Sequence, residues 1–431
     1  MRAAAFDNFY LSLLSRQEGY AFPYRSAVLS YKYFFVLWKQ YILHRHYQKL
    51  CTKSLPETLK GYVSEEQFHR AQAYGRDKAR YSFTKAAFLL VLETLWFTHN
   101  VLPRFWDLSS GIMFGLFSLE TENEELIELP SELYRIFVVE ERHGFNKQSW
   151  GLFMKDFVVM TLVRAVFEMP LYAGLIKVFK MGGANFYIHA WLFVVAFQLL
   201  MIIVYPSLIQ PLFNKFTPLP KGELPLMIEA LARRVQFPLQ KLFVVDGSKC
   251  FSHSNAYFYG FFKSKRIVLF DTLLEHLRID ETCAVLGHWS YNHTNALLVG
   301  SLSEIFFAFF LFSQMVNNRG LFTSFGFTNS APTLVGFVLF LCQYTPISKV
   351  TDFARNTVSR DYEFLADAFA CDLGYAASLS SGLMKLQLKN LGNTNPYWLY
   401  SMYHRNHPEI VERLDATKQR TAIPSKSNKI D

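Results

Sequence analysis

The stretch Phe186-Tyr-Ile-His-Ala-Trp-Leu-Phe-Val-Val-Ala-Phe-Gln-Leu-Leu-Met-Ile-Ile-Val-Tyr205 contains no formally charged residue, and its most polar members are His189 and Gln198. Pro206 follows it directly. An apolar helix of about 20 residues is long enough to cross the hydrocarbon core of a bilayer. The stretch therefore predicts a transmembrane helix that ends at Pro206, and it places the chain among integral membrane proteins.

Further apolar stretches are candidate spans: 157–179, 86–101, 296–316, the somewhat short 333–347, and a weaker one at 27–43. Several of them carry ionisable side chains, namely Glu93, Arg164, Glu168 and Glu304. Charges inside spans are costly, and they usually face a bundle interior or a water-filled cavity. We therefore expect a helical bundle with a wet interior. The alternative is that some spans begin and end a few residues away from these limits.

The composition agrees with a membrane protein. Of the 431 residues, 51% are hydrophobic and 18% are charged, whereas a soluble domain carries about 25% charged residues. The formal net charge of +9 fits the Lys and Arg bias of cytosolic membrane loops. Nucleic-acid binding is the other interpretation, but no basic stripe with interleaved aromatic residues supports it. We expect membrane lipid, and no nucleic acid, as a partner. The five Cys residues are too scattered to predict a disulfide framework.

Polar regions divide the chain into four segments. Residues 206–295 contain a Pro-rich linker, an amphipathic helix at Leu226–Val235, and two strand-like runs at 242–246 and 266–270. The acidic residues 120–132 predict an exposed loop. We expect a membrane region with loops, a soluble region, further spans and a C-terminal helical region, at 1–205, 206–295, 296–347 and 348–431 respectively.

Two histidines stand close together in Ala284-Val-Leu-Gly-His-Trp-Ser-Tyr-Asn-His-Thr294. A helical zinc site uses His-Glu-x-x-His, because residues i and i+4 share one helix face and the Glu activates the metal-bound water. Here His288 and His293 are at i,i+5, which separates them by about 140° on an ideal helix. Trp289, rather than Glu, follows His288. This pair alone predicts interior or interfacial histidines rather than joint ligands of one ion.

Two carboxylates lie one helical turn apart in Ser359-Arg-Asp-Tyr-Glu-Phe-Leu-Ala-Asp-Ala-Phe-Ala370, at Glu363 and Asp367. Glu is a suitable third zinc ligand, and an Asp one turn on can hold an imidazole N–H or donate a proton. A solvated helix face is the alternative interpretation. The neighbouring Ala366 and Phe369 favour burial instead.

Six segments, in this order, resemble the type I CAAX prenyl protease family of integral-membrane zinc metalloproteases. They are 54–64 with Phe68 and Asp77-Lys78, Glu140-Glu-Arg-His-Gly-Phe-Asn-Lys-Gln148, Pro211-Leu-Phe-Asn-Lys-Phe-Thr-Pro-Leu-Pro220, 246–249 with 252–263, Ser359–Ala370, and His407-Pro-x-x-x-Glu-Arg413.

The resemblance implies an all-α polytopic membrane protein. About six to seven spans would form a helical bundle enclosing a chamber, with a small α+β protease-like domain. It also implies one zinc ion, residence in the endoplasmic reticulum membrane, and prenylated protein C-termini as partners. The implied reaction removes the C-terminal tripeptide from prenylated proteins.

The resemblance further implies roles for individual residues. Glu363 would be a zinc ligand, and Asp367 the proton donor or a second-shell carboxylate. Asn255 and Ala256 would lie on an edge strand that pairs with the substrate backbone. Two more residues would lie near the site and hold an oxyanion or the substrate carboxylate, namely His407 and Arg413. His407 alone could equally cap a helix or pack against one.

The zinc helix departs from the family pattern, which reads Ala-Val-Leu-Gly-His-Glu-Leu-Gly-His-Trp. Four residues are missing here, so His288 matches the second family histidine as a metal ligand, and no residue matches the first histidine or the catalytic Glu. The loss turns the following helix by only about 40° and shortens it by about 6 Å, so its buried face can survive. Two functions follow as hypotheses: a zinc metalloendopeptidase, or an inactive paralogue or truncated isoform that binds prenylated proteins without cleavage.

Overall fold

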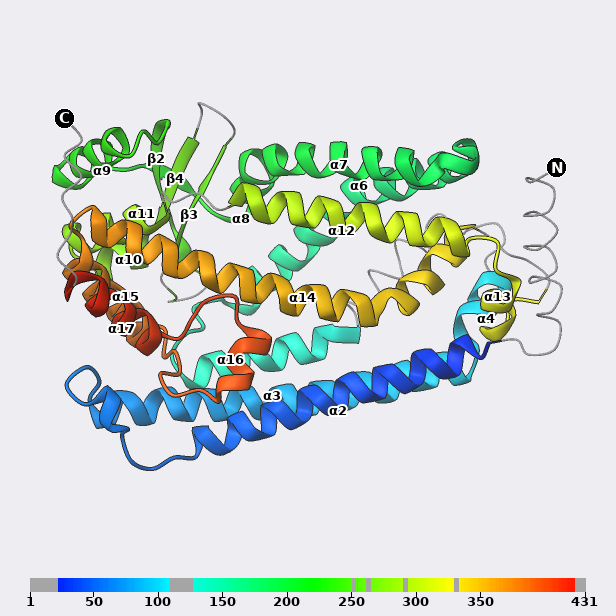
Figure 1. The fold of residues 1–431 in the computed structure, drawn as a ribbon, viewed down its shortest axis with the longest axis horizontal. Helices are drawn as coiled ribbons and strands as arrows, with labels where there is room; N and C mark the ends of the chain where they lie inside the picture. Colours follow the sequence, from blue (N-terminus) through cyan, green and yellow to red (C-terminus); the bar gives the residue numbers. More distant parts are fainter. Residues whose placement is uncertain are drawn as a thin grey trace, which may run out of the picture.

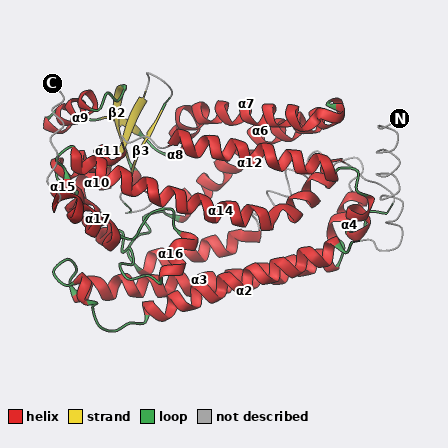
Figure 2. Cartoon of the chain, viewed as in Figure 1, coloured by secondary structure: helices red, strands yellow, loops and turns green. Residues whose placement is uncertain are grey.

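The computed structural model describes residues 22–108, 127–249, 253, 255–260, 265–289, 294–328 and 333–422. Long helices run along the longest axis of the molecule, and a small sheet with short helices lies at one end of them (Figures 1 and 2). This arrangement confirms the predicted fold class of a helical membrane bundle with a small α+β part.

Four helices among the described residues are long and apolar enough to cross a membrane. They contain the predicted spans at 157–179, 186–205, 296–316 and 333–347, and they are α6 (Trp150–Met181), α7 (Phe186–Val204) with its continuation, α12 (Thr294–Met315) and α14 (Thr333–Asp372). The predicted span at 27–43 lies in a long, more polar helix, α2 (Tyr24–Leu50), and most of the span at 86–101 lies in another, α3 (Glu65–Thr98). A crossing of the membrane by α2 and α3 stays a prediction.

Two prolines do not end their helices, and the helix end predicted at Pro206 was wrong. After α7 the chain continues through Pro206 as a π-helical turn, η5 (Tyr205–Ile209), and then as α8 (Gln210–Phe213). A π-turn changes the hydrogen-bonding pattern locally, so the missing N–H of a proline can be accommodated. Pro346 lies inside α14, which extends from the span at its start to Asp372. One helix therefore connects the membrane bundle to the predicted carboxylates.

Two of the ionisable residues predicted inside spans, Glu93 and Glu304, have partners on neighbouring helices. Lys32 of α2 forms an ion pair with Glu93 of α3 at 3.0 Å. Glu304 of α12 accepts a hydrogen bond from Thr351 at 2.6 Å and pairs with Arg355 at 3.1 Å, both on α14. These contacts fit charges that face the interior of a bundle.

One face of α6 is apolar and exposed. Val158, Leu162 and Val166 follow one another at four-residue spacing and are 51%, 62% and 65% exposed. Residues at this spacing share one helix face. An apolar face of this kind suits contact with lipid tails better than contact with water.

A four-stranded sheet forms the α+β part, in the order β1-β2-β4-β3. Its central strands pair in parallel and contain the two predicted runs, whereas both outer strands are antiparallel to their neighbours. The predicted strand is found as the outer strand β3, which begins at Ala256, whereas Asn255 lies one residue before it. The strands are β1 (Phe216–Pro218), β2 (Leu239–Val245), β3 (Ala256–Tyr259) and β4 (Lys265–Phe270).

Helices pack against this sheet around one apolar core that includes Leu269, Cys283 and Ala284. The predicted amphipathic helix is confirmed as α9 (Glu223–Arg234). The other helices at this end are α10 (Asp271–His276), α11 (Ile279–Trp289), α15 (Ala376–Lys389), α16 (Trp398–His404) and α17 (Ile410–Ala422). Two short helices lie at the other end of α2, namely α4 (Val101–Leu108) and α13 (Arg319–Ser324).

The acidic loop predicted at 120–132 is wrong where the structure describes it, because residues 127–134 are helical. They continue as a π-helical segment, η3 (Arg135–Glu140). Ion pairs with basic residues stabilise this helix, since Glu128 pairs with Lys85 of α3 at 2.9 Å and Glu132 pairs with Arg135 one turn on. Residues 120–126 lie outside the described residues.

Candidate metal centre

Helix α11 is buried along most of its length and ends in the candidate site. Its first turn contains Glu281, which accepts a hydrogen bond from the backbone N–H of Arg278 at 2.9 Å and pairs with Lys385 of α15 at 2.7 Å. Every residue from Glu281 to His288 is buried. The helix therefore presents the His288 imidazole to the protein interior rather than to water. The second histidine of the sequence motif, His293, lies outside the described residues.

Helix α14 places both predicted carboxylates against that imidazole. His288 Nδ1 lies 2.9 Å from Asp367 Oδ1, and His288 Nε2 lies 3.3 Å from Glu363 Oε2. All three side chains are buried. The two ring nitrogens are thus held between two carboxylates that are one helical turn apart, which is the arrangement expected if Glu363 and Asp367 share a face.

Helix α17 adds a buried guanidinium to the cluster. Arg413 donates hydrogen bonds to both oxygens of Asp367, at 2.8 and 2.7 Å, and lies 3.3 Å from Glu363. Burial lowers the pKa of His288, but the interactions with the Asp367 and Glu363 carboxylates outweigh this effect and raise the pKa above its usual value. Without a metal, the cluster is a closed network of two carboxylates, one imidazole and one guanidinium.

The turn before α17 brings a second histidine to the site. His407 Nδ1 lies 2.9 Å from Glu363 Oε2, and its side chain is 58% exposed. Arg360, one turn before Glu363, donates to the His407 carbonyl at 3.1 Å and pairs with Glu412 at 2.8 Å. Sequence reasoning gave Arg360 no role. Its signal was an arginine three residues before Glu363, on nearly the same helix face.

Asn255 and Ala256 lie at the start of β3, outside the contacts just described. Ala256 pairs with Leu269 of β4. The Asn255 carbonyl accepts a hydrogen bond from the backbone N–H of Phe270 at 3.1 Å. The structure therefore brings together five of the predicted site residues and places these two on the edge strand.

Two residues of the cluster have the geometry of zinc ligands. Ligands at about 2.0–2.1 Å from a tetrahedral zinc ion lie about 3.3 Å from one another, and His288 Nε2 and Glu363 Oε2 are 3.3 Å apart. Glu363 Oε2 is buried and accepts no hydrogen bond of normal geometry. Asp367 stands on the other ring nitrogen, where a second-shell carboxylate orients a ligating histidine.

The set of ligands is nevertheless incomplete. A catalytic zinc takes three protein ligands and a water. Within the described part of the chain, no group of three or more His, Cys, Asp or Glu side chains could hold a metal ion. The described residues therefore do not make up a complete catalytic zinc site; they provide two ligands and the carboxylate behind one of them.

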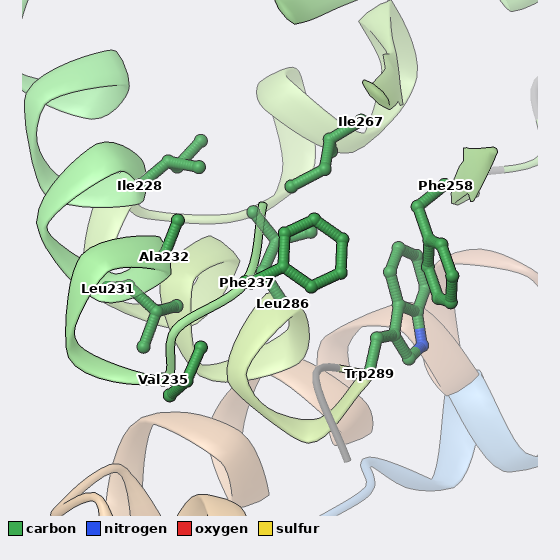
Figure 3. A pocket seen from close by; sticks show the side chains of 9 residues that line it. All are labelled: Ile228, Leu231, Ala232, Val235, Phe237, Phe258, Ile267, Leu286 and Trp289. Atoms are coloured by element: carbon green, nitrogen blue, oxygen red, sulfur yellow. The ribbon is translucent and has the colours of Figure 1, made fainter. Parts of the chain in front are cut away.

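A small apolar cavity adjoins the end of α11, between Leu286, Trp289, the sheet and α9 (Figure 3). Its volume is about 20 Å³, enough for about one water molecule. A prenyl chain or a substrate side chain does not fit there. We therefore do not include this cavity in the candidate site.

Comparisons with known proteins cover nearly the whole chain. Residues 46–215 match the model of the CAAX prenyl protease N-terminal region with five membrane helices, and residues 218–421 match the model of peptidase family M48. The crystal structure of S. mikatae Ste24p superimposes with a TM-score of 0.87 at 36% sequence identity, covering 92% of this chain and 99% of that one.

Curated relatives agree with the family models. The CAAX prenyl protease 1 homolog of Arabidopsis thaliana is 40% identical, over 92% of this chain and 98% of the relative. The human homolog is 37% identical, over 91% and 94%. CAAX prenyl protease 1 of Saccharomyces cerevisiae is 38% identical, over 88% and 91%.

Proposed function

Because this chain belongs to the CAAX prenyl protease family within peptidase family M48, we propose that it is a membrane zinc metalloendopeptidase acting on prenylated proteins. Its reaction removes the C-terminal tripeptide that follows the prenylated cysteine. Its place is the endoplasmic reticulum membrane, which it crosses several times. We infer the activity from membership of the family and the roles of individual residues from the candidate site.

One observation supports the proposal most strongly: the contact of His288 with both carboxylates of α14. Glu363 and His288 would be metal ligands, and Asp367 would hold the imidazole through Nδ1. Glu363 and Asp367 lie in one of the segments that resemble the family, whereas His288 lies in the zinc helix that departs from the family pattern. A solvated helix face would not place two carboxylates, both buried, on one imidazole.

The remaining residues have roles in binding the substrate. The outer strand β3, with Ala256 at its start and Asn255 just before it, would pair with the peptide backbone, as in other cases of β-augmentation. Two cationic or hydrogen-bonding groups, His407 and Arg413, would hold the developing oxyanion or the C-terminal carboxylate. Zinc, when bound in this family, supplies a Lewis acid and an activated water.

A second function is favoured by the end of α11. No residue of the zinc helix matches the first family histidine or the catalytic Glu, and a third ligand is lacking among the described residues. The unaltered chain would then bind prenylated C-termini without cutting them. Four residues decide between the two functions.

The test compares the unaltered chain with an extended variant in which Gly-His-Glu-Leu is inserted before Gly287. Zinc content and tripeptide release from a farnesylated peptide are measured for both. We expect the extended variant to bind one zinc and to cleave, and the unaltered chain to bind the peptide with little cleavage. Chelator-sensitive cleavage by the unaltered chain would favour the protease without the insertion. Failure of both forms to bind the peptide would contradict both functions.

A further inference from the structure

A buried carboxylate on η3 faces the segment that leads into the substrate strand. Glu140 is 4% exposed and lies in the π-helical turn that ends η3. Its Oε2 is 3.6 Å from Nε2 of His253, three residues before β3 begins. The two residues belong to motifs that the site has not explained: 140–148 and 252–263.

On the side of α3, hydrogen bonds hold the Glu140 carboxylate in place. Tyr74 of α3 donates to Glu140 Oε1 at 3.0 Å and to Oε2 at 2.9 Å, and both side chains are buried. Burial raises the pKa of Glu140, but the ion-pair contact with His253 and the hydrogen bonds from Tyr74 outweigh it and lower the pKa below its usual value. The carboxylate is therefore charged and fixed in position by α3.

The sheet side is held from two directions. The His253 ring stacks on Phe145, with ring centroids 4.1 Å apart, and Phe145 packs against Tyr74. The His253 carbonyl accepts a hydrogen bond from Thr272 of α10 at 3.1 Å. The entrance to β3 is thus clamped between the membrane helices and the domain that holds α11.

Such a clamp matters because β3 is a short strand with one partner. It contains four residues, and among the strands that the structure describes it pairs with β4. Short edge elements open locally at low free-energy cost. A substrate backbone that adds to this edge needs Asn255 and Ala256 in one place, so any freedom of the strand entrance is lost on binding and weakens affinity.

We propose that Glu140 is a positioning residue for the substrate strand, acting through His253 and supported by Tyr74. The inference rests on the proposed function, since it assigns β3 to binding of a prenylated peptide. It adds a residue outside the metal centre, on a different element, that sets the place of the peptide backbone.

The experiment measures binding of a fluorescein-labelled farnesylated peptide ending in Cys-Val-Ile-Met to the full chain in detergent. Chelator is present so that no hydrolysis occurs. We expect Glu140→Gln and His253→Phe each to weaken binding about five- to ten-fold, the range for loss of one charge-assisted contact that is partly exposed. His253→Phe keeps the stacking on Phe145 and is partly exposed, so it is expected to fold. The double variant should bind no more weakly than either single variant, because both changes break one contact.

Asp77→Asn is the matched control. Asp77 lies three residues after Tyr74 on α3 and is bound by His143 at 3.0 Å and Arg142 at 2.9 Å, so its removal disturbs the same helix pair without touching His253. We expect its affinity to stay within about two-fold of the unaltered chain. In Glu140→Gln, hydrogen exchange should rise at residues 255–260 and stay unchanged at 239–245.

Three results would overturn the inference while leaving the proposed function standing: unchanged affinity in Glu140→Gln and His253→Phe, an equal loss in Asp77→Asn, or fully additive losses in the double variant. The proposed function itself would be contradicted if the unaltered chain bound the farnesylated peptide no better than the same peptide without the farnesyl group. The inference would then be contradicted as well.

Discussion

The two sides of the candidate metal centre differ in completeness. On the side of α14 and α17, Glu363, Asp367 and Arg413 form a buried network with short contacts. On the side of α11, only His288 reaches this network, and the described helix ends at Trp289. A loss of four residues rotates a helix by only about 40°, so packing can survive where a ligand and a base cannot. The fold therefore tolerates the loss of four residues from this helix better than the metal centre does.

The largest effect is expected on the free energy of unfolding when the network between α14 and α17 loses its guanidinium. Arg413→Met leaves Asp367 and Glu363 without their guanidinium, and removing one partner of a buried pair costs about 3–5 kcal/mol. Chemical unfolding followed by fluorescence would measure this loss. Arg420→Met is the control on the same helix, because its partner Asp372 is exposed as well. An equal loss in both variants would contradict the account of the buried network.

The second-largest effect is expected on the zinc affinity of the extended variant. Asp367→Asn removes the carboxylate behind His288, and loss of such a partner weakens metal affinity about 10- to 100-fold. Competition with a fluorescent zinc chelator measures the affinity. Asp372→Asn, on the same helix but paired with Arg420, is the control. Unchanged zinc affinity in Asp367→Asn would show that Asp367 does not orient His288.

A third prediction concerns the start of α11 and depends on pH. Burial raises the pKa of Glu281, but hydrogen bonds from Lys385, Ser381 and the backbone N–H of Arg278 lower it below its usual value. A depressed folded-state pKa stabilises the fold above the unfolded value of about 4.3, and this contribution is lost as the pH falls through the folded value.

Lys385→Met should therefore lower the unfolding free energy by about 1 kcal/mol at pH 7, since Lys385 is partly exposed. It should also flatten the fall in stability between pH 7 and acidic pH. Lys389→Met, at the end of the same helix, is the control. A variant that keeps the full pH slope would contradict this role of Glu281.

The smallest expected effect is that of a chelator on stability. A ligand stabilises a protein only in proportion to its binding to the folded form. We expect chelator to leave the melting temperature of the unaltered chain within about 1 °C and to lower that of the extended variant by several degrees. A large decrease in the unaltered chain would mean that its two ligands hold a metal tightly.

Patterns that depend on one helix or one strand could be predicted from the sequence. Four spans were predicted from apolar length, the common face of Glu363 and Asp367 from their four-residue spacing, and the central strands from two short strand-like runs. Features that depend on tertiary contacts could not be predicted in this way. Helix α14 passes Pro346 and joins a span to the site, and Glu140 meets His253 from a distant part of the chain. Neither feature has a local signal.

The four residues missing from the zinc helix, about one helical turn, leave the fold intact and leave the metal centre incomplete. The most direct test is the zinc affinity of the unaltered chain and of the extended variant, measured side by side by chelator competition. We expect the extended variant to bind one zinc tightly and the unaltered chain to bind zinc at least about 100-fold more weakly. One zinc bound with equal affinity by both chains would contradict it.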